Sequence, residues 1–375
     1  MRKWSIILIF IFSSSYLSKK ASCQSNDLSK EIPASIGVSG LDNISVDKSS
    51  EQAEDWARYA RSSGSSQAWM HFYRFKRLEF IKAKGKELGK PEQSELTGIY
   101  QEAKVFLGSG HEAKWMLYLE NYMQNEGFVF LEEAYAKSNT DHAILPDVAG
   151  MYLVKSNNSA LKKVLKELKA SGYFDQALLV YAKNTLKCLP ANAILISSGA
   201  SDTWPLLIEQ QINGTRPDVR IVFVDGLLHQ PYRQKISSDL LKNSSSLNDL
   251  SLKECVWKIG GQCKKYPVLQ ALTLPESFQL NQQQNLEILG LSLLWKASAT
   301  GHEIPSPTQM WNGLLDKNFT QFNHSINKNY LPLLFALREQ FYKSGNTNNA
   351  RQVEEGIRSI ASQMPNQQVI LQMLK

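Results

Sequence analysis

Hydrophobic and polar positions repeat along this chain with two different periods, and each period predicts a different kind of element. Between residues 51 and 187, apolar residues recur every three or four positions, as on one face of an α-helix. Gly, Ser and Asn separate these segments, as at helix ends. The pattern predicts a first helix whose shared face contains Trp69, Phe72, Tyr73, Lys76 and Phe80, followed by helices at 112–124, 128–137, 145–155, 159–170 and 174–187.

Short helices joined by tight polar turns indicate stacked helical hairpins. Segments 149–172 and 334–365 share one order: an aromatic residue late in the first helix, a polar turn, and a second helix that opens near an alanine. This order resembles tetratricopeptide repeats, although the period is irregular. In such repeats each hairpin is too small to bury its apolar face alone and must stack on its neighbours.

A different pattern lies between the helical segments. The runs at 193–197 and 219–224 are short, apolar and rich in β-branched residues, which predicts two buried strands. Because a helical stretch at about 203–212 joins them, we expect a parallel pair with a right-handed crossover. A helix at 231–241, a strand at 267–274 and an apolar stretch at 286–295 follow. The predicted fold class is mainly α with an inserted α/β layer, in which tetratricopeptide-like hairpins flank a small parallel or mixed sheet.

The N-terminus has the features of an export signal. Three residues that include Arg2 and Lys3 precede an apolar run at 4–17, which is too short to span a bilayer as a helix because that needs about 20 residues. Lys19 and Lys20 after the run leave an uncleaved anchor open. Cys23 is either the lipidated residue of a bacterial lipoprotein or the last residue before a signal-peptidase cut. Removing 1–23 takes away four cations and no acid, and lowers the formal charge from +7 to +3.

Composition and patterning together predict five segments. These are a signal peptide at 1–23, a flexible linker at 24–50, a helical-repeat domain at 51–188, an α/β domain at 189–300 and C-terminal helical hairpins at 301–375. Hydrophobic residues at 43% and charged residues at 21% are ordinary values for globular domains. Since no basic stripe with interleaved aromatic residues is present in the sequence, we expect no nucleic-acid partner.

Four stretches in the second half resemble one known family in order and spacing. They are GASDTWPLL at 199–207, GTRPDVRIV at 214–222, YPVLQALTLP at 266–275 and LEILGLSLLW at 286–295. From about residue 191 onward the chain resembles the soluble C-terminal region of the bacterial protein O-mannosyltransferase-like membrane family. Ala200 and Ser201 replace an Asp and an Asn of the family pattern, which leaves only Asp202 of an acidic cluster. The resemblance implies an accessory region and no catalytic activity, because the family's transferase chemistry is associated with its membrane half.

The candidate binding site consists of polar residues that follow the first two predicted strands. Its members are Gly199, Ser201, Asp202, Thr203, Asp225 and His229. Ligands of open α/β sheets bind beyond the carboxyl ends of parallel strands, where a helix N-terminus can also receive an anion or a sugar hydroxyl.

Two other interpretations apply to the same residues. Ser201 or Asp202 could cap the following helix, with Pro205 in its first turn. A hydrolase with Ser201 as nucleophile is disfavoured, because Thr203 stands where the nucleophile elbow needs glycine.

The spacing of the remaining cysteines and of the histidines gives little indication of a disulfide or a metal site. Cys255 and Cys263 flank VWKIGGQ, which predicts a hairpin with Gly260 and Gly261 at its turn. In an oxidising compartment these two cysteines could form a disulfide, although pairing does not follow from spacing alone. The six histidines are scattered and show no ligand spacing on one helix. We therefore expect no metal and no cofactor.

The combined prediction is an exported protein of a Gram-negative cell envelope, either periplasmic or associated with the outer membrane. We expect a non-catalytic helical-repeat scaffold or binding protein whose partner is an envelope protein or a glycan. Membrane association is expected only through a lipid or an uncleaved signal anchor. The alternatives are a carbohydrate-related enzyme and an accessory subunit of a membrane glycosyltransferase.

Overall fold

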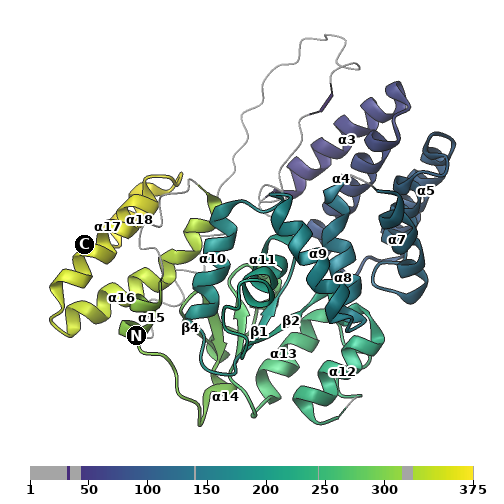
Figure 1. The fold of residues 1–375 in the computed structure, drawn as a ribbon. Helices are drawn as coiled ribbons and strands as arrows, with labels where there is room; N and C mark the ends of the chain where they lie inside the picture. Colours follow the sequence, from purple (N-terminus) through teal and green to yellow (C-terminus); the bar gives the residue numbers. More distant parts are fainter. Residues whose placement is uncertain (1–31, 34–43, 139–140, 244, 315–323, 375) are drawn as a thin grey trace. The chain divides into compact units, whose positions relative to one another are not determined.

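The computed structural model describes residues 32–33, 44–138, 141–243, 245–314 and 324–374. Within these residues the chain is mainly helical with one small mixed sheet of five strands, so the predicted fold class is confirmed (Figure 1). The chain divides into two compact units. The helical unit contains the described residues up to Tyr173 together with Asp225–Tyr232. The sheet unit contains Phe174–Val224 and the described residues from Arg233 onward.

Seven α-helices form the described part of the helical unit, with a short 3-10 helix, η2 (His142–Ile144), before α8. They are α3 (Val46–Ser63), α4 (Ser66–Lys84), α5 (Lys90–Leu107), α6 (His111–Glu120), α7 (Asn125–Lys137), α8 (Leu145–Val154) and α9 (Asn158–Ala170). Neighbouring helices pack as pairs, α3 on α4, α6 on α7 and α8 on α9, which are the expected stacked hairpins. The 3-10 helix η3 (Asp225–Leu228) also belongs to this unit.

Local signals explain where these helices begin and end. The Ser45 and Ser65 hydroxyls accept backbone N–H groups at the starts of α3 and α4, and Gly64 ends α3 in the left-handed region at φ 65°. Helix α3 begins within the segment predicted as linker. The predicted helices between 112 and 170 agree with α6 to α9 within four residues at each end.

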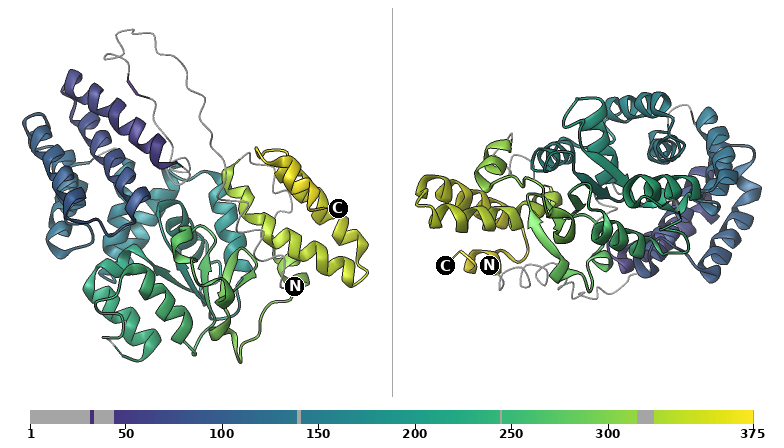
Figure 2. Two further views of the ribbon diagram at one scale, coloured as in Figure 1. Left: turned by 180° about the vertical axis from the view of Figure 1, so that it is seen from behind. Right: turned by 90° about the horizontal axis from the view of Figure 1, so that it is seen from below.

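The sheet unit has the strand order β2-β1-β3-β5-β4, and Figure 2 shows its sheet from behind. Its strands are β1 (Ile194–Ser197), β2 (Arg220–Phe223), β3 (Val268–Ala271), β4 (Leu286–Leu289) and β5 (Ser292–Trp295). Strand β1 is parallel to β2 and β3, whereas β5 is antiparallel to β3 and β4. The predicted parallel pair is confirmed, and the apolar stretch at 286–295 is a hairpin that turns at Gly290 with φ 59°.

The helices of the sheet unit lie before, between and after its strands. They are α10 (Gln176–Lys187), α11 (Ala200–Gln211), α12 (Gln230–Leu241, whose first three residues belong to the helical unit), α13 (Leu252–Gln262), α14 (Lys296–Ala299), α15 (Pro307–Gly313), α16 (Leu331–Lys343), α17 (Thr347–Ala361) and α18 (Gln367–Gln372), with short 3-10 helices η4 (Glu276–Phe278), η5 (Gln283–Asn285) and η6 (Ser325–Tyr330). The predicted domain boundaries near 188 and 300 do not coincide with the limits of the two units. Helix α10 packs on α11, and the α16–α17 hairpin belongs to the same unit as the sheet.

The predicted cysteine hairpin is wrong, because residues 252–262 form α13. Ser251 and Glu254 begin this helix with a reciprocal capping box. Cys255 and Cys263 lie eight residues apart along the helical path, which corresponds to about 12 Å of rise. A disulfide needs Cα atoms about 4.4–6.8 Å apart, so these two cysteines cannot pair here. Both are buried free thiols, as is Cys188.

The predicted signal peptide, including Cys23, and most of the linker lie outside the described residues. Every helix within the described residues is too short or too polar to cross a bilayer.

Candidate functional site

The turn between β1 and α11 contains four of the predicted site residues. Gly199 adopts φ 89°, which lets the helix begin directly after the strand. The carboxylate of Asp202 is buried and accepts the backbone N–H of Ser198 at 3.1 Å. The hydroxyl of Thr203 lies 3.0 Å from that of Ser197, and both side chains are fully buried. These hydrogen bonds lie within the turn between β1 and α11 and stabilise it.

Neither Ser201 nor Asp202 is the N-cap that the sequence predicts. The N-cap is Gly199, without a side-chain hydrogen bond, and Pro205 stands inside the helix instead of in its first turn. Asp202 lies in the first turn, where its charge still favours the helix N-terminus, but it bonds backward to Ser198. Ser201 is half-buried.

Replacement of Asp202 by Ala is expected to lower the free energy of unfolding by about 1–3 kcal/mol, because a buried N–H loses its acceptor. Ser201→Ala is the matched control and is expected to change it by no more than about 0.5 kcal/mol. Urea unfolding followed by far-UV circular dichroism measures both changes. A loss in the Ser201 variant as large as that in the Asp202 variant would contradict this structural role.

Gln270 of β3 is a polar residue that the sequence did not single out. It lies between Ile196 and Leu293 in the sheet register and is fully buried. Neither its amide nitrogen nor its amide oxygen has a hydrogen-bond partner among the described residues. Buried amides normally have hydrogen-bond partners, so Gln270 is a polar exception in an otherwise apolar strand. Its apolar sequence context gave no signal of this.

The structure places Asp225 in the helical unit, so the predicted set of six residues is divided between the two units. The Asp225 carboxylate is buried and pairs with the ammonium of Lys86, two residues after α4. It also accepts the hydroxyl of Tyr122 at 3.2 Å. These partners precede Asp225 by more than 100 residues in the chain.

His229 also belongs to the helical unit. Its Nε2 lies 3.2 Å from Oδ1 of Asn125, and its ring lies 5.4 Å from that of Phe128. Burial, and secondarily the charge of Lys155, lowers the pKa of His229, which favours the neutral ring. Its Nδ1 is buried without a partner among the described residues. This setting gives His229 a packing role.

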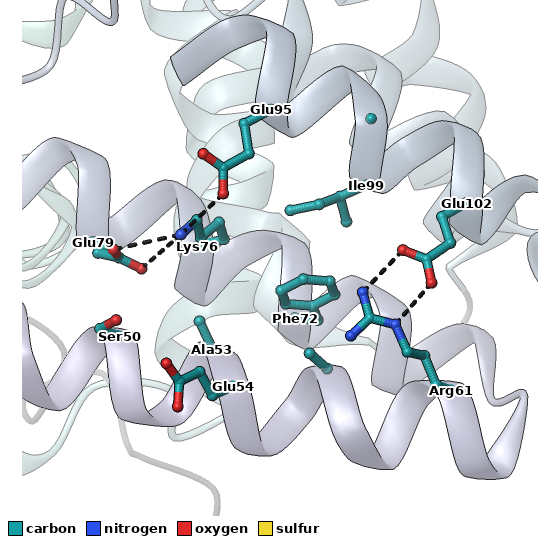
Figure 3. A pocket seen from close by; sticks show the side chains of 12 residues that line it. Ser50, Ala53, Glu54, Arg61, Phe72, Lys76, Glu79, Glu95, Ile99 and Glu102 are labelled. Carbon is teal, nitrogen blue, oxygen red and sulfur yellow. Dashed lines mark hydrogen bonds and ion pairs between the residues drawn. The ribbon is translucent and has the colours of Figure 1, made fainter. Parts of the chain in front are cut away.

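A separate open groove lies between α3, α4 and α5 (Figure 3). Its volume is about 470 Å³. Four apolar side chains line it, namely Ala53, Ala57, Phe72 and Ile99. The predicted aromatic stripe is therefore divided: Trp69 and Tyr73 are fully buried in the core, whereas Phe72 and Lys76 line the groove.

Ion pairs between helices hold the sides of this groove. Arg61 of α3 donates from Nε to Oε1 of Glu102 at 2.7 Å and from Nη2 to Oε2 at 3.0 Å, a bidentate pair with α5. This hydrogen bonding raises the pKa of Arg61 and lowers that of Glu102. Lys76 of α4 lies 3.0 Å from Glu95 and 3.3 Å from Glu79. Two ion pairs thus connect α5 with α3 and with α4 (Figure 3).

The groove has an excess of negative charge. Four glutamates against one arginine and one lysine leave a formal charge of −2 on its lining. Glu54 is exposed and has no ion-pair partner in the described part of the chain, so it is available to an incoming cation.

No group of His, Cys, Asp and Glu side chains suited to a metal ion occurs among the described residues. The contacts described above contain no paired nucleophile and base.

Comparison with known proteins gives one finding for the sheet unit. Residues 179–259 match the family model of TMEM260-associated domain 2. The match includes the stretches at 199–207 and 214–222, covers less than a quarter of the chain, and is compatible with the O-mannosyltransferase-like resemblance. No curated protein and no solved structure matches the chain. The chain is thus similar, from within α10 to within α13, to a TMEM260-associated domain, and apart from Asp225–Tyr232 the matched residues belong to the sheet unit.

Proposed function

We propose that this chain is an exported, non-catalytic helical-repeat protein that binds an extended segment of a partner protein in the groove of its helical unit. The proposal rests on the groove between α3, α4 and α5. It combines an open, mainly charged lining above buried apolar side chains with sides held by bidentate and bridging ion pairs, so little ordering is needed when a partner binds.

Charge complementarity favours a basic segment. The lining has a formal charge of −2, and Glu54 forms no ion pair among the described residues. A Lys or Arg of the partner would pair with Glu54. The aliphatic part of that Lys or Arg would lie over the small exposed parts of Phe72 and Ile99, so charge contributes more to binding than apolar area.

Gly98→Trp tests the groove directly. Gly98 lines the groove, and a Cβ built there meets nothing within 4 Å, so the indole fills the groove without disturbing the core. With a fluorescently labelled peptide of alternating Lys and Leu, anisotropy is expected to show binding to the wild type and at least about tenfold weaker binding to the variant. Val129→Trp is the matched control, because Val129 is exposed on α7 and 56% accessible.

Two results would contradict the proposal. One is equal affinity of the wild type and Gly98→Trp for the Lys-Leu peptide. The other is equal binding of a peptide of alternating Glu and Leu, because that would remove the role of the negative lining.

The proposed location rests on the N-terminal pattern. Mass spectrometry of the N-terminus, on protein purified from a Gram-negative envelope, distinguishes the possibilities. A chain beginning at Gln24 indicates a signal cut, and an acylated Cys23 indicates a lipoprotein. A chain that retains Met1 and fractionates with the cytoplasm would contradict export.

A second candidate function is that of an accessory subunit of a membrane glycosyltransferase. It is favoured by the match to TMEM260-associated domain 2 and by the orphaned amide of Gln270 in the sheet unit. Co-purification of a glycosyltransferase from membranes, weakened by Gln270→Leu, would support it. Co-purification that is unchanged in this variant would exclude a role for the buried amide.

A further inference from the structure

Helix α4 has a second polar face, on the side opposite the groove. At about 100° per residue, Phe72, Lys76 and Glu79 lie along one stripe of α4, and Arg74 and Arg77 lie along the opposite one. The contacts agree with this geometry. Lys76 reaches Glu95 of α5, whereas Arg74 covers the ring of Trp115 from α6.

Both arginines of this second face lie over aromatic rings. The guanidinium carbon of Arg74 is 4.8 Å from the ring centroid of Trp115, and that of Arg77 is 4.5 Å from the centroid of Tyr122. In the described part of the chain neither arginine forms an ion pair with a carboxylate. A stacked guanidinium keeps its planar fork of N–H donors at the ring edge, and this fork matches a carboxylate or a phosphate.

Three buried polar atoms beside these arginines lack partners. Arg77 Nε and the hydroxyls of Tyr73 and Tyr118 have no hydrogen bond within the described residues, and both tyrosines are fully buried. Burial raises the pKa of Tyr118 far above its usual value, with further increases from Asp147 and Tyr122. Tyr118 is therefore a neutral hydroxyl next to a carboxylate, and a buried hydroxyl without a partner is unfavourable.

Two carboxylates, those of Asp147 and Asp225, lie near the two arginines and the tyrosines. Asp147 of α8 accepts the indole N–H of Trp115 at 2.7 Å. Burial raises the pKa of Asp147, whereas the charges of Arg74 and Arg77 act to lower it. Asp225 is already paired with Lys86, whereas Asp147 and the unpartnered Oε1 of Glu120 can each accept another donor. Arg74, Arg77, Tyr122 and Asp147 each keep part of their surface exposed, so the site lies at the edge of the helical core.

We propose that Arg74 and Arg77, with Trp115, Tyr118 and Asp147, bind an oxyanion carried on a polyhydroxylated carbon frame, such as a uronic acid or a sugar phosphate. The two guanidinium forks hold the oxyanion. Asp147 accepts hydrogen bonds from hydroxyls of the frame, and the Tyr118 hydroxyl gains the partner that it lacks. This site is separate from the peptide groove and does not depend on it.

Calorimetric titration of the full chain at low ionic strength tests the proposal. The probes are glucose 1-phosphate, glucuronate, glucose and inorganic phosphate. We expect one or both anionic sugars to bind, and glucose and inorganic phosphate to bind at least about tenfold more weakly. The preferred anionic sugar identifies whether the oxyanion is a phosphate or a carboxylate. Arg77→Gln is expected to weaken binding by at least about tenfold, whereas Arg58→Gln, on the exposed face of α3, leaves it unchanged.

Tyr118→Phe keeps the test decisive if the arginine variant folds poorly. Removing an orphaned hydroxyl should leave the melting temperature equal or higher, while binding of the anionic sugar weakens by about threefold or more. Gly98→Trp, which blocks the groove, should leave sugar binding intact. The proposal is overturned if neither anionic sugar binds, if inorganic phosphate binds as tightly as glucose 1-phosphate, or if Tyr118→Phe and Arg77→Gln both bind like the wild type.

Discussion

Replacement of Arg216 by Gln is expected to lower the free energy of unfolding of the sheet unit by about 3 kcal/mol. The guanidinium donates to three backbone carbonyls, those of Leu186, Leu189 and Pro190, at 2.7–3.1 Å. It also forms a bidentate pair with Asp218, with both contacts at 2.8 Å. Gln cannot replace this fork of donors, so several carbonyls lose their partner together.

This one side chain joins two parts of the unit. The carbonyl of Leu186 belongs to the last turn of α10, where the helix dipole favours a cation. Arg216 itself lies in the turn before β2 and adopts φ 48°. Its loss therefore loosens the packing of α10 next to the sheet as well as the turn. Urea unfolding followed by tryptophan fluorescence measures the change.

Arg220→Gln provides the matched control two positions after Asp218. Arg220 pairs with Asp239, and both side chains are more than a third exposed, so the loss should be no more than about 1 kcal/mol. Equal losses in the two variants would contradict the role of Arg216 as a bridge.

The pH dependence gives a second readout for Arg216. Its hydrogen bond is the main cause that lowers the pKa of Asp218 to about 2. Because this folded-state pKa lies below the unfolded value, the pair stabilises the fold above about pH 4 and ceases to do so as the pH falls toward 2. The stability difference between the wild type and Arg216→Gln should shrink in this window, and a constant difference would contradict the pairing.

The second large effect is expected at Gly260 of α13. A Cβ at this position would lie 2.2 Å from Cδ2 of Trp295, a ring that is 2% exposed in β5. Neither the helix nor the strand can move without disturbing the core, so Gly260→Ala should lower the free energy of unfolding by about 3 kcal/mol. Thermal and urea unfolding of the full chain measure this loss.

Gly261→Ala is the control, and the expected sign is opposite. A Cβ at Gly261 meets nothing within 4 Å, and Ala is favoured over Gly in a helix by about 0.5–1 kcal/mol. A hairpin turn at these two glycines would instead make both substitutions unfavourable. Two losses of similar size would therefore contradict helix α13.

Residues 252–262 carry two competing sequence signals. Two consecutive glycines favour a turn, whereas the apolar spacing of Leu252, Cys255, Val256 and Ile259 favours a helix. Gly260 is needed there for close packing on Trp295, a contact between residues 35 positions apart. The other main elements were predictable because their burial produces a clear period in the sequence.

The candidate sites were less predictable because they depend on contacts between distant elements. The turn at Asp202 follows from local strand-to-helix chemistry, and its residues do come together. Asp225 pairs with Lys86 across 139 positions, which no local pattern indicates. Arg74 and Arg77 are spaced as an ordinary solvated helix face, and only the folded chain places aromatic rings beneath them.

Photo-crosslinking from position 98 tests the central claim that the groove binds a partner segment. The full chain would carry a photo-reactive amino acid at position 98 or, as a control, at position 129, and would be irradiated in its native envelope. We predict a discrete protein adduct from position 98 that is lost with Glu54→Lys and is absent from position 129. Identical adducts from both positions, or an adduct from position 98 that Glu54→Lys leaves unchanged, would contradict the account.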